Sequence, residues 1–194
     1  MGKIFYVMGK SASGKDTVFK EILKRMPELK TVVPYTTRPI RSGEKDGVEY
    51  YFTTEEGLEE LKTEGKIIEM RTYQTVFGPW SYSTVNDGQI DLEKNCYLMI
   101  GTLESYRDTR DYFGRSVLVP VYIEVEDGER LFRAISREKE QKQPKYAELC
   151  RRFLADAEDF SEEKLLEAGI TVRFENDDID KCLKNVEDMI RKNK

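Results

Sequence analysis

The chain of 194 residues divides into short apolar runs and longer segments whose apolar residues recur every three or four positions. The apolar runs have the length of buried strands and occupy residues 4–8, 97–100, 117–125 and 170–174. The periodic segments predict amphipathic helices over about residues 16–26, 103–113, 127–168 and 179–190. Pro120 weakens its strand, and Pro144 breaks the longest helical segment. Strands that alternate with helices are typical of an α/β fold with a parallel sheet.

Residues 30–90 interrupt this alternation. The first part, residues 30–53, is rich in Thr, Arg, Gly and Tyr and has no helical period, so strands and turns are expected there. Thr53 and Glu56 fit a capping box for a helix that ends near Gly65. After that helix we expect a strand at residues 66–71 and then a loop around Gly78. We therefore predict one domain, in which an α+β lobe of about residues 34–90 is inserted into a core of residues 1–33, 91–126 and 169–194.

The loop between the first strand and the first helix has the pattern Gly-x-x-x-x-Gly-Lys, from Gly9 to Lys15. A glycine-rich turn that leads into a helix directs several backbone N–H groups at one anion, and the lysine neutralises terminal phosphates. A turn that binds nothing is the alternative, but the strand before it and the helix after it favour a nucleotide-binding P-loop. The residues expected to contact ATP here are Gly9, Ser11, Ala12, Ser13, Gly14, Lys15, Asp16 and Thr17.

Asp16 stands where a P-loop usually carries the Ser or Thr that holds Mg²⁺. A carboxylate can bind Mg²⁺ directly or through water, although it adds negative charge beside the triphosphate. We therefore predict that Asp16 is a Mg²⁺ ligand. The alternative is that Asp16 only stabilises the N-terminus of the helix, where a carboxylate is electrostatically favourable.

Composition and charge narrow the function further. The chain has 39% hydrophobic and 36% charged residues, and no apolar run approaches the ~20 residues of a membrane span, so we expect a cytoplasmic protein without a signal peptide or membrane contact. A net charge of −5 argues against a general nucleic-acid surface. The three cysteines lack metal-ligand spacing, and the absence of histidine excludes Ser-His-Asp catalysis. Phosphoryl transfer needs no imidazole, because it depends on positioning and cationic groups.

A second candidate phosphate site lies between Tyr35 and Phe52. Arg38 and Arg41 are three residues apart in a turn rich in Gly and Pro. Two guanidinium groups at this spacing can grip the dianionic phosphate of a nucleoside monophosphate, and Tyr50 can add its hydroxyl. Solvated surface charge is the alternative for both arginines, but the neighbouring aromatic residues favour a binding site.

This segment contains Thr-Thr-Arg, a second arginine, Gly-Glu, a further glycine and Tyr-x-Phe, and it resembles the substrate-binding signature of guanylate kinases. The resemblance extends from the P-loop over most of the chain. It implies a nucleoside monophosphate kinase that transfers the γ-phosphoryl group of Mg-ATP to GMP or dGMP. The implied fold is a P-loop parallel sheet flanked by helices, with an inserted acceptor-binding lobe and a helical lid at about residues 127–168.

The resemblance also implies roles for individual residues. Glu69 would accept hydrogen bonds from guanine N1 and N2, since an ionised carboxylate is an acceptor only. Phe77 and Gly78 take the place of a Tyr-Gly pair at the acceptor site, so a hydroxyl to phosphate is missing there unless Tyr82 supplies it. The catalytic residues implied are Lys15, Arg38 and the lid arginines Arg133, Arg137 and one of Arg151 and Arg152, of which Arg152 is preferred. Asn176 is implied to contact the adenine of ATP.

Three positions depart from the family pattern. Pro34 replaces a Ser that helps to read guanine O6, Asp16 replaces the P-loop hydroxyl, and the strand at residues 97–102 lacks the usual aspartates. A kinase of the same fold that acts on another nucleotide or on a sugar phosphate is therefore an alternative, which Glu69 argues against. A non-catalytic phosphopeptide-binding module of this family is a second alternative, which the retained P-loop argues against. The sequence does not indicate the oligomeric state.

Overall fold

The computed structural model describes residues 1–75 and 77–194, which form two sheets. A parallel sheet in the order β6-β1-β7-β8 consists of β1 (Ile4–Met8), β6 (Tyr97–Ile100), β7 (Leu118–Glu124) and β8 (Arg173–Glu175). A mixed sheet in the order β3-β2-β5-β4 consists of β2 (Tyr35–Thr36), β3 (Tyr51–Phe52), β4 (Ile67–Thr75) and β5 (Gly78–Val85). In the mixed sheet β5 runs antiparallel to both of its neighbours.

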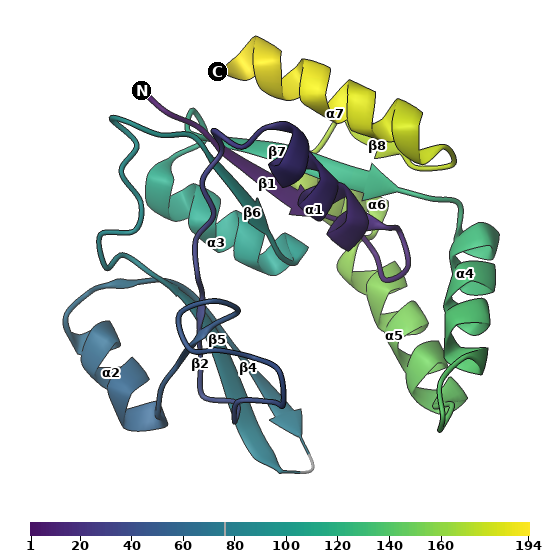
Figure 1. Cartoon of the computed structure of the whole chain (residues 1–194), viewed down its shortest axis with the longest axis horizontal. Helices are drawn as coiled ribbons and strands as arrows, with labels where there is room; N and C mark the ends of the chain where they lie inside the picture. Colours follow the sequence, from purple (N-terminus) through teal and green to yellow (C-terminus); the bar gives the residue numbers. More distant parts are fainter. Residues whose placement is uncertain (76) are drawn as a thin grey trace.

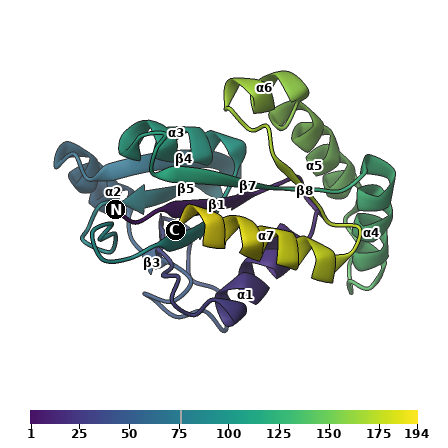
Figure 2. The same cartoon turned by 90° about the horizontal axis from the view of Figure 1, so that it is seen from above.

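Helices cover both faces of the parallel sheet (Figure 1, Figure 2). On one face lie α1 (Lys15–Arg25) and α7 (Ile179–Asn193). On the opposite face lie α3 (Leu103–Phe113) and the short α6 (Glu162–Glu167). The α/β fold predicted from the alternation of apolar runs and periodic segments is therefore confirmed.

The core consists of two buried clusters, one on each face of the parallel sheet. Successive residues of β1 alternate between them: Ile4, Tyr6 and Met8 belong to the cluster under α3, and Phe5 and Val7 belong to the cluster under α1 and α7. Side chains of a strand point alternately to the two faces, so a strand buried on both faces reads as an uninterrupted apolar run.

Pro120 lies within β7 opposite Tyr6 of β1. A proline removes a backbone N–H and is tolerated where the strand has no partner on that side. The second neighbour of β7 is β8, whose pairing begins only at Tyr122. At Pro120, β7 therefore pairs with β1 but not yet with β8, so the missing N–H of the proline is tolerated and the apolar run remains a strand.

The mixed sheet differs from the prediction at its hairpin. The expected loop around Gly78 is wrong, because Gly78 begins β5 and pairs with Thr75 at the end of an extended β4. The residues of β5 include three buried hydroxyl side chains, Ser81, Ser83 and Thr84, rather than an apolar run, so their sequence carried a weak strand signal. Pairing with β4 and β2 makes this segment a strand.

Beside the hairpin, α2 (Glu55–Thr63) completes the lobe that carries the mixed sheet (Figure 1). Its N-cap is Thr54, whose hydroxyl accepts a hydrogen bond from the Gly57 N–H. The N-cap is thus Thr54 rather than Thr53, and the predicted capping box does not form, because the residue at N3 is Gly57, which has no side chain. The helix itself forms where it was expected.

Two further helices, α4 (Asp127–Lys139) and α5 (Tyr146–Asp159), project from the parallel sheet on the same side as the mixed sheet (Figure 1). They pack against each other and are separated by the break expected near Pro144. None of the described helices is long and apolar enough to cross a lipid bilayer.

Candidate active site

The P-loop between β1 and α1 packs so closely that two of its glycines cannot carry a side chain. A Cβ atom at Gly9 would lie 2.5 Å from the Ile123 carbonyl oxygen, and one at Gly14 would lie 2.4 Å from Nδ2 of Asn176. Ala12 adopts a φ of 63° and is the one non-glycine residue with positive φ among the described residues. This left-handed conformation costs an L-residue about 1–2 kcal/mol, which the surrounding contacts must offset.

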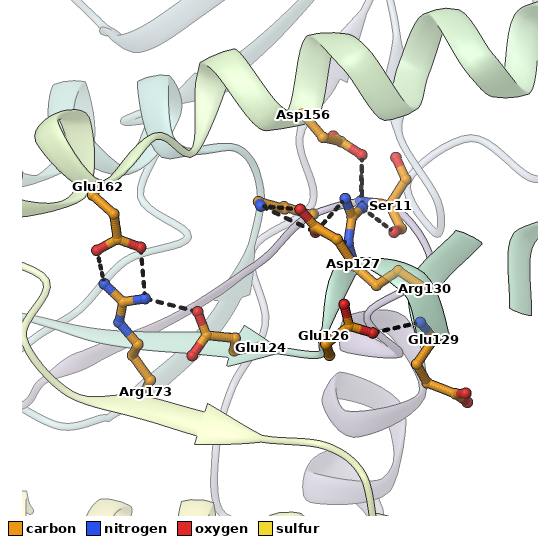
Figure 3. A network of polar contacts seen from close by, with 10 residues as sticks. Ser11, Glu124, Glu126, Asp127, Glu129, Arg130, Asp156, Glu162 and Arg173 are labelled. Atoms are coloured by element: carbon orange, nitrogen blue, oxygen red, sulfur yellow. Dashed lines mark hydrogen bonds and ion pairs between the residues drawn. The ribbon is translucent and has the colours of Figure 1, made fainter. Parts of the chain in front are cut away.

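Two side chains from α4 and α5 hold the backbone of the loop (Figure 3). Asp156 accepts a hydrogen bond from the Ser11 N–H at 2.7 Å, and Arg130 donates from Nη1 to the Ser11 carbonyl oxygen at 2.8 Å. The Arg130 side chain is 1% exposed, and its Nε donates to Asp127 at 3.0 Å. The ring of Phe153 covers its guanidinium, with 4.6 Å between Cζ and the ring centroid. Both helices are therefore connected to the P-loop through Ser11.

Neither Arg130 nor Asp156 was among the residues predicted from the sequence. Both lie in segments rich in charged residues, where one arginine or aspartate resembles the next. Their role follows from the packing of α4 against α5, which brings Arg130 Nη1 to 3.4 Å from Asp156 Oδ2. No local pattern in the sequence could have predicted this contact.

Lys15 and Asp16 begin α1 at the edge of a cleft of about 1440 Å³. The Lys15 Nζ lies 3.4 Å from Oδ2 of Asp16, whose side chain is 75% exposed. Ser13 is buried behind the loop, and Thr17 is exposed on α1. The other predicted site residues that line this cleft are Arg41, Tyr50, Glu69, Phe77 and Arg152. The fold thus brings P-loop, lobe and α5 residues around one cavity.

Arg38 forms a bidentate ion pair with Glu44. Nη2 lies 2.8 Å from Oε1 and Nη1 lies 2.9 Å from Oε2, and Arg38 is only 3% exposed. Hydrogen bonds from Arg38 and from the Arg41 N–H lower the pKa of Glu44 to about 2, and Glu44 in turn raises the pKa of Arg38. The Arg38 Cζ lies 5.1 Å from the ring centroid of Tyr50. The pair keeps a charged guanidinium fixed beside this ring.

Tyr82 on β5 is also close to Tyr50, with 5.7 Å between the ring centroids. Phe77 is 80% exposed in the turn between β4 and β5, where it stacks on Trp80 at 6.0 Å. Gly78 follows Phe77 at the start of β5. The structure therefore places Tyr82, rather than Phe77 and Gly78, next to the residues expected to bind the acceptor phosphate.

Glu69 is buried on β4, and both of its carboxylate oxygens accept a hydrogen bond. Thr84 donates to Oε1 at 2.8 Å, and Nε of Arg71 donates to Oε2 at 2.9 Å. Nη1 of Arg71 reaches Thr102 at 3.3 Å, and both of these residues line the cleft. Sequence reasoning missed Arg71, although residues two apart on a strand share a face and the spacing could have indicated the pair.

The three predicted lid arginines lie in different parts of the structure. Arg152 lines the cleft and contacts Glu148 at 3.3 Å. Arg133 instead donates from Nη2 to the carbonyl oxygen of Asn176 at 3.1 Å. Arg137 lines a smaller cavity between α4 and α5. Of the three, the described structure brings Arg152 together with Lys15 in the main cleft.

The family model of guanylate kinase matches residues 1–193 of this chain. The chain belongs to the guanylate kinase family. A guanylate kinase of Parasynechococcus marenigrum is 28% identical over 203 residues, which cover 98% of each chain. A guanylate kinase of Legionella pneumophila (strain Lens) is 36% identical over 84 residues, and this match spans 43% of this chain and 39% of the Legionella protein.

A crystal structure of guanylate kinase from Anaplasma phagocytophilum has the same fold, with a TM-score of 0.68 at 21% sequence identity. The match covers 98% of this chain and 85% of the Anaplasma chain. The family resemblance drawn from the P-loop and from the segment around Arg38 is therefore confirmed. The assignment of individual site residues stays a prediction.

Proposed function

We propose that this member of the guanylate kinase family transfers the γ-phosphoryl group of ATP to GMP or dGMP, giving ADP and the nucleoside diphosphate. The observation that carries the proposal is the single cleft lined by Lys15 of the P-loop on one side and by Arg41, Tyr50 and Glu69 of the lobe on the other. A donor and an acceptor nucleotide bound to these groups would meet in one cavity. Family membership supports the same reaction.

In the proposed reaction an oxygen of the acceptor phosphate attacks the γ-phosphorus in line, and the bond from the γ-phosphorus to the β–γ bridging oxygen breaks. ADP leaves with that electron pair. The attacking oxygen is already anionic, so no general base is required, in keeping with a chain that has no histidine. Lys15 and the loop N–H groups would hold the donor phosphates, while Arg38, Arg41 and Tyr50 would hold the acceptor phosphate.

Arg152 is proposed to stabilise the charge on the transferring group, an effect worth roughly 10³–10⁵ in rate for cationic residues of this kind. Arg133 and Arg137 lie outside the main cleft, so the same role for them requires that α4 and α5 close over the bound nucleotides. Such closure would also exclude water and prevent hydrolysis of ATP. Asn176 is proposed to border the adenine. Its side chain contacts the P-loop, because its amide donates to the Ser13 carbonyl oxygen.

Asp16 fits a Mg²⁺ ion bound together with ATP. Mg²⁺ is commonly held by one or two carboxylates, with phosphate oxygens and water completing its shell. Asp16 supplies one exposed carboxylate at the cleft, and the described residues contain no cluster of three or more acidic, cysteine or histidine side chains that could hold a metal without the nucleotide. The ion would neutralise charge on the β and γ phosphates.

The test is steady-state turnover with GMP, dGMP, AMP, CMP and UMP in an assay that couples ADP formation to a spectroscopic signal. We expect GMP and dGMP to be the preferred acceptors, and faster turnover of another monophosphate would overturn the proposal. A Lys15→Met variant controls for contaminating kinases. It should lose nearly all turnover but still bind GMP, because Lys15 acts on the donor phosphates.

A further inference from the structure

Glu69 and Arg71 form a buried ion pair inside the cleft that is proposed to bind the acceptor. The two side chains lie two residues apart on β4 and therefore share one face of the strand. Their side chains are 1% and 16% exposed, and both line the cleft together with Thr102. A charged pair at this depth must retain hydrogen-bond partners, because unsatisfied buried charges are costly.

The known contacts leave part of the capacity of both side chains unused. A guanidinium has five N–H groups, of which Arg71 uses Nε–H on Glu69 and one Nη1–H on Thr102. The remaining three have no partner among the described residues. A carboxylate accepts about four hydrogen bonds, of which Glu69 receives one from Arg71 and one from Thr84. Donors on Arg71 and acceptors on Glu69 are thus available side by side.

Other residues that line the cleft are apolar or already hydrogen-bonded. The hydroxyl of Thr84 donates to Glu69, and that of Thr102 accepts from Arg71. Pro34 lines it but has neither a backbone N–H nor a polar side chain. Gly101 also lines it, and a Cβ atom there would lie 2.2 Å from the hydroxyl of Tyr6, so this position cannot carry a longer side chain while Tyr6 is present. Tyr6 is itself buried and hydrogen-bonded to Ser105 at 2.7 Å. The hydrogen-bonding groups that remain free beside these residues are therefore those of Glu69 and Arg71 on β4.

We propose that Arg71 determines base specificity by donating to O6 of guanine, while Glu69 accepts from N1–H and N2–H₂. The inference rests on the proposed function and deepens it. The guanine edge presents an acceptor, a donor and a donor in the order O6, N1 and N2, and an arginine beside a carboxylate presents the complementary groups. Arginine is also a favoured donor to guanine O6 in DNA, where it contacts O6 and N7 together. Adenine carries a donor at C6, which would oppose the guanidinium.

Arg71 is suited to this role because it stays protonated. Burial lowers its pKa, but the carboxylate of Glu69 raises it, and the net direction is upward. The Arg71 guanidinium donates from Nε to Glu69 and from Nη1 to the Thr102 hydroxyl at the N-cap of α3, and these two contacts fix its orientation. A donor held at both ends discriminates between acceptor atoms better than a mobile one, since it cannot follow a mismatched base.

The test compares three acceptors in the wild type and in Arg71→Met: GMP, 6-thio-GMP and IMP. In 6-thio-GMP a weakly accepting sulfur replaces O6, and IMP lacks the amino group at C2. We expect the wild type to prefer GMP over 6-thio-GMP by about 10-fold to 100-fold in kcat/KM. In Arg71→Met this preference should fall to about one, while the preference for GMP over IMP, which reports the contact with Glu69, persists.

An unchanged preference for GMP over 6-thio-GMP in Arg71→Met would overturn the inference and leave the proposed function standing. Loss of both preferences together would also overturn it, because Arg71 would then act only by positioning Glu69. If the wild type prefers a base other than guanine, the proposed function itself fails. Arg107→Met is a matched control, since Arg107 is an exposed arginine of α3 that pairs with Glu167 at 3.8 Å and should leave every ratio unchanged.

If Arg71→Met does not fold, Arg71→Lys provides the same test with the charge retained. A lysine supplies a single flexible donor in place of a fixed fork. We expect the GMP to 6-thio-GMP ratio of Arg71→Lys to lie between those of the wild type and unity, with an unchanged ratio of GMP to IMP. A wild-type value for the first ratio in this variant would contradict a role for the fork.

Discussion

The side-chain amide of Asn176 donates a hydrogen bond to the Ser13 carbonyl oxygen at 2.8 Å, across 163 residues of sequence. Asn176 follows β8, so this contact ties the edge of the parallel sheet to the P-loop. Gly14 has a φ of 82°, which favours glycine, and a Cβ atom there would also lie 2.4 Å from the donating nitrogen. The shape of the phosphate-binding loop thus depends on a residue near the other end of the chain.

Replacing Asn176 with Asp is expected to destabilise the P-loop. The substitution removes the donor and places a carboxylate beside the Ser13 carbonyl oxygen in a buried position. We expect the free energy of unfolding to fall by about 1–3 kcal/mol and the KM for ATP to rise. Chemical denaturation and steady-state kinetics measure the two effects. Asn193→Asp is the control, since the Asn193 amide makes an exposed contact with Met189 in α7, and comparable losses in both variants would contradict the prediction.

Tyr82→Phe should weaken binding of the acceptor, because it removes a hydroxyl next to Tyr50 and leaves the ring in place. We expect the KM for GMP to rise about 5-fold to 10-fold, as for the loss of one hydrogen bond. Phe77→Leu, in the exposed turn between β4 and β5, should leave the KM for GMP unchanged. The reverse outcome in GMP titrations would restore Phe77 to the acceptor site.

Asp16→Asn distinguishes a metal ligand from a carboxylate that only stabilises the first turn of α1, whose N-cap is Gly14. If Asp16 positions Mg²⁺, the Mg²⁺ concentration for half-maximal rate should increase by about tenfold or more. If Asp16 only interacts with the dipole of α1 from its first turn, Asn removes that charge but leaves the Mg²⁺ dependence unchanged. A titration of the purified variant with Mg²⁺ at fixed ATP gives the answer, and an unshifted curve would exclude the metal role.

The ion pair between Arg38 and Glu44 predicts a pH dependence of stability. The pKa of Glu44 is lowered to about 2 in the folded protein, chiefly by the hydrogen bond from Arg38, from an ordinary value near 4.5. A carboxyl group with a lowered pKa contributes stability above its unfolded-state pKa and loses it as the pH falls toward the folded value. The wild type should therefore exceed Glu44→Gln in unfolding free energy by a constant amount above about pH 5, and the difference should shrink between pH 4.5 and 2.

This difference can be followed by urea denaturation of both proteins at several pH values. A difference that grows as the solution is acidified would contradict the assignment, because protonation of Glu44 must remove the charge that distinguishes it from Gln. Arg38 stays protonated over this whole range, so it does not contribute a titration of its own.

Much of the fold and part of the candidate site follow from short-range patterns. The run of apolar residues at 4–8, the loop from Gly9 to Lys15 and the amphipathic segment after it are contiguous, and β1, the P-loop and α1 form there. The turn that contains Arg38 and Arg41 is equally local, since Glu44 closes it from six residues away. Patterns of this kind can be recognised in the sequence, because each depends only on near neighbours and on the regular geometry of a strand or helix.

The contacts that only the tertiary structure decided join segments with no common pattern. Arg130 and Asp156 reach Ser11 from two different helices, and Tyr82 takes a place beside Tyr50 because β5 pairs with both β2 and β4. Neither relationship can be predicted from residue spacing. The spacing of a charged residue on a helix, or of a hydroxyl residue on a strand, is the same whether its side chain faces solvent or a cleft. The sequence therefore determined the class of fold and its phosphate-binding loop, while packing between distant elements decided which side chains surround the cleft.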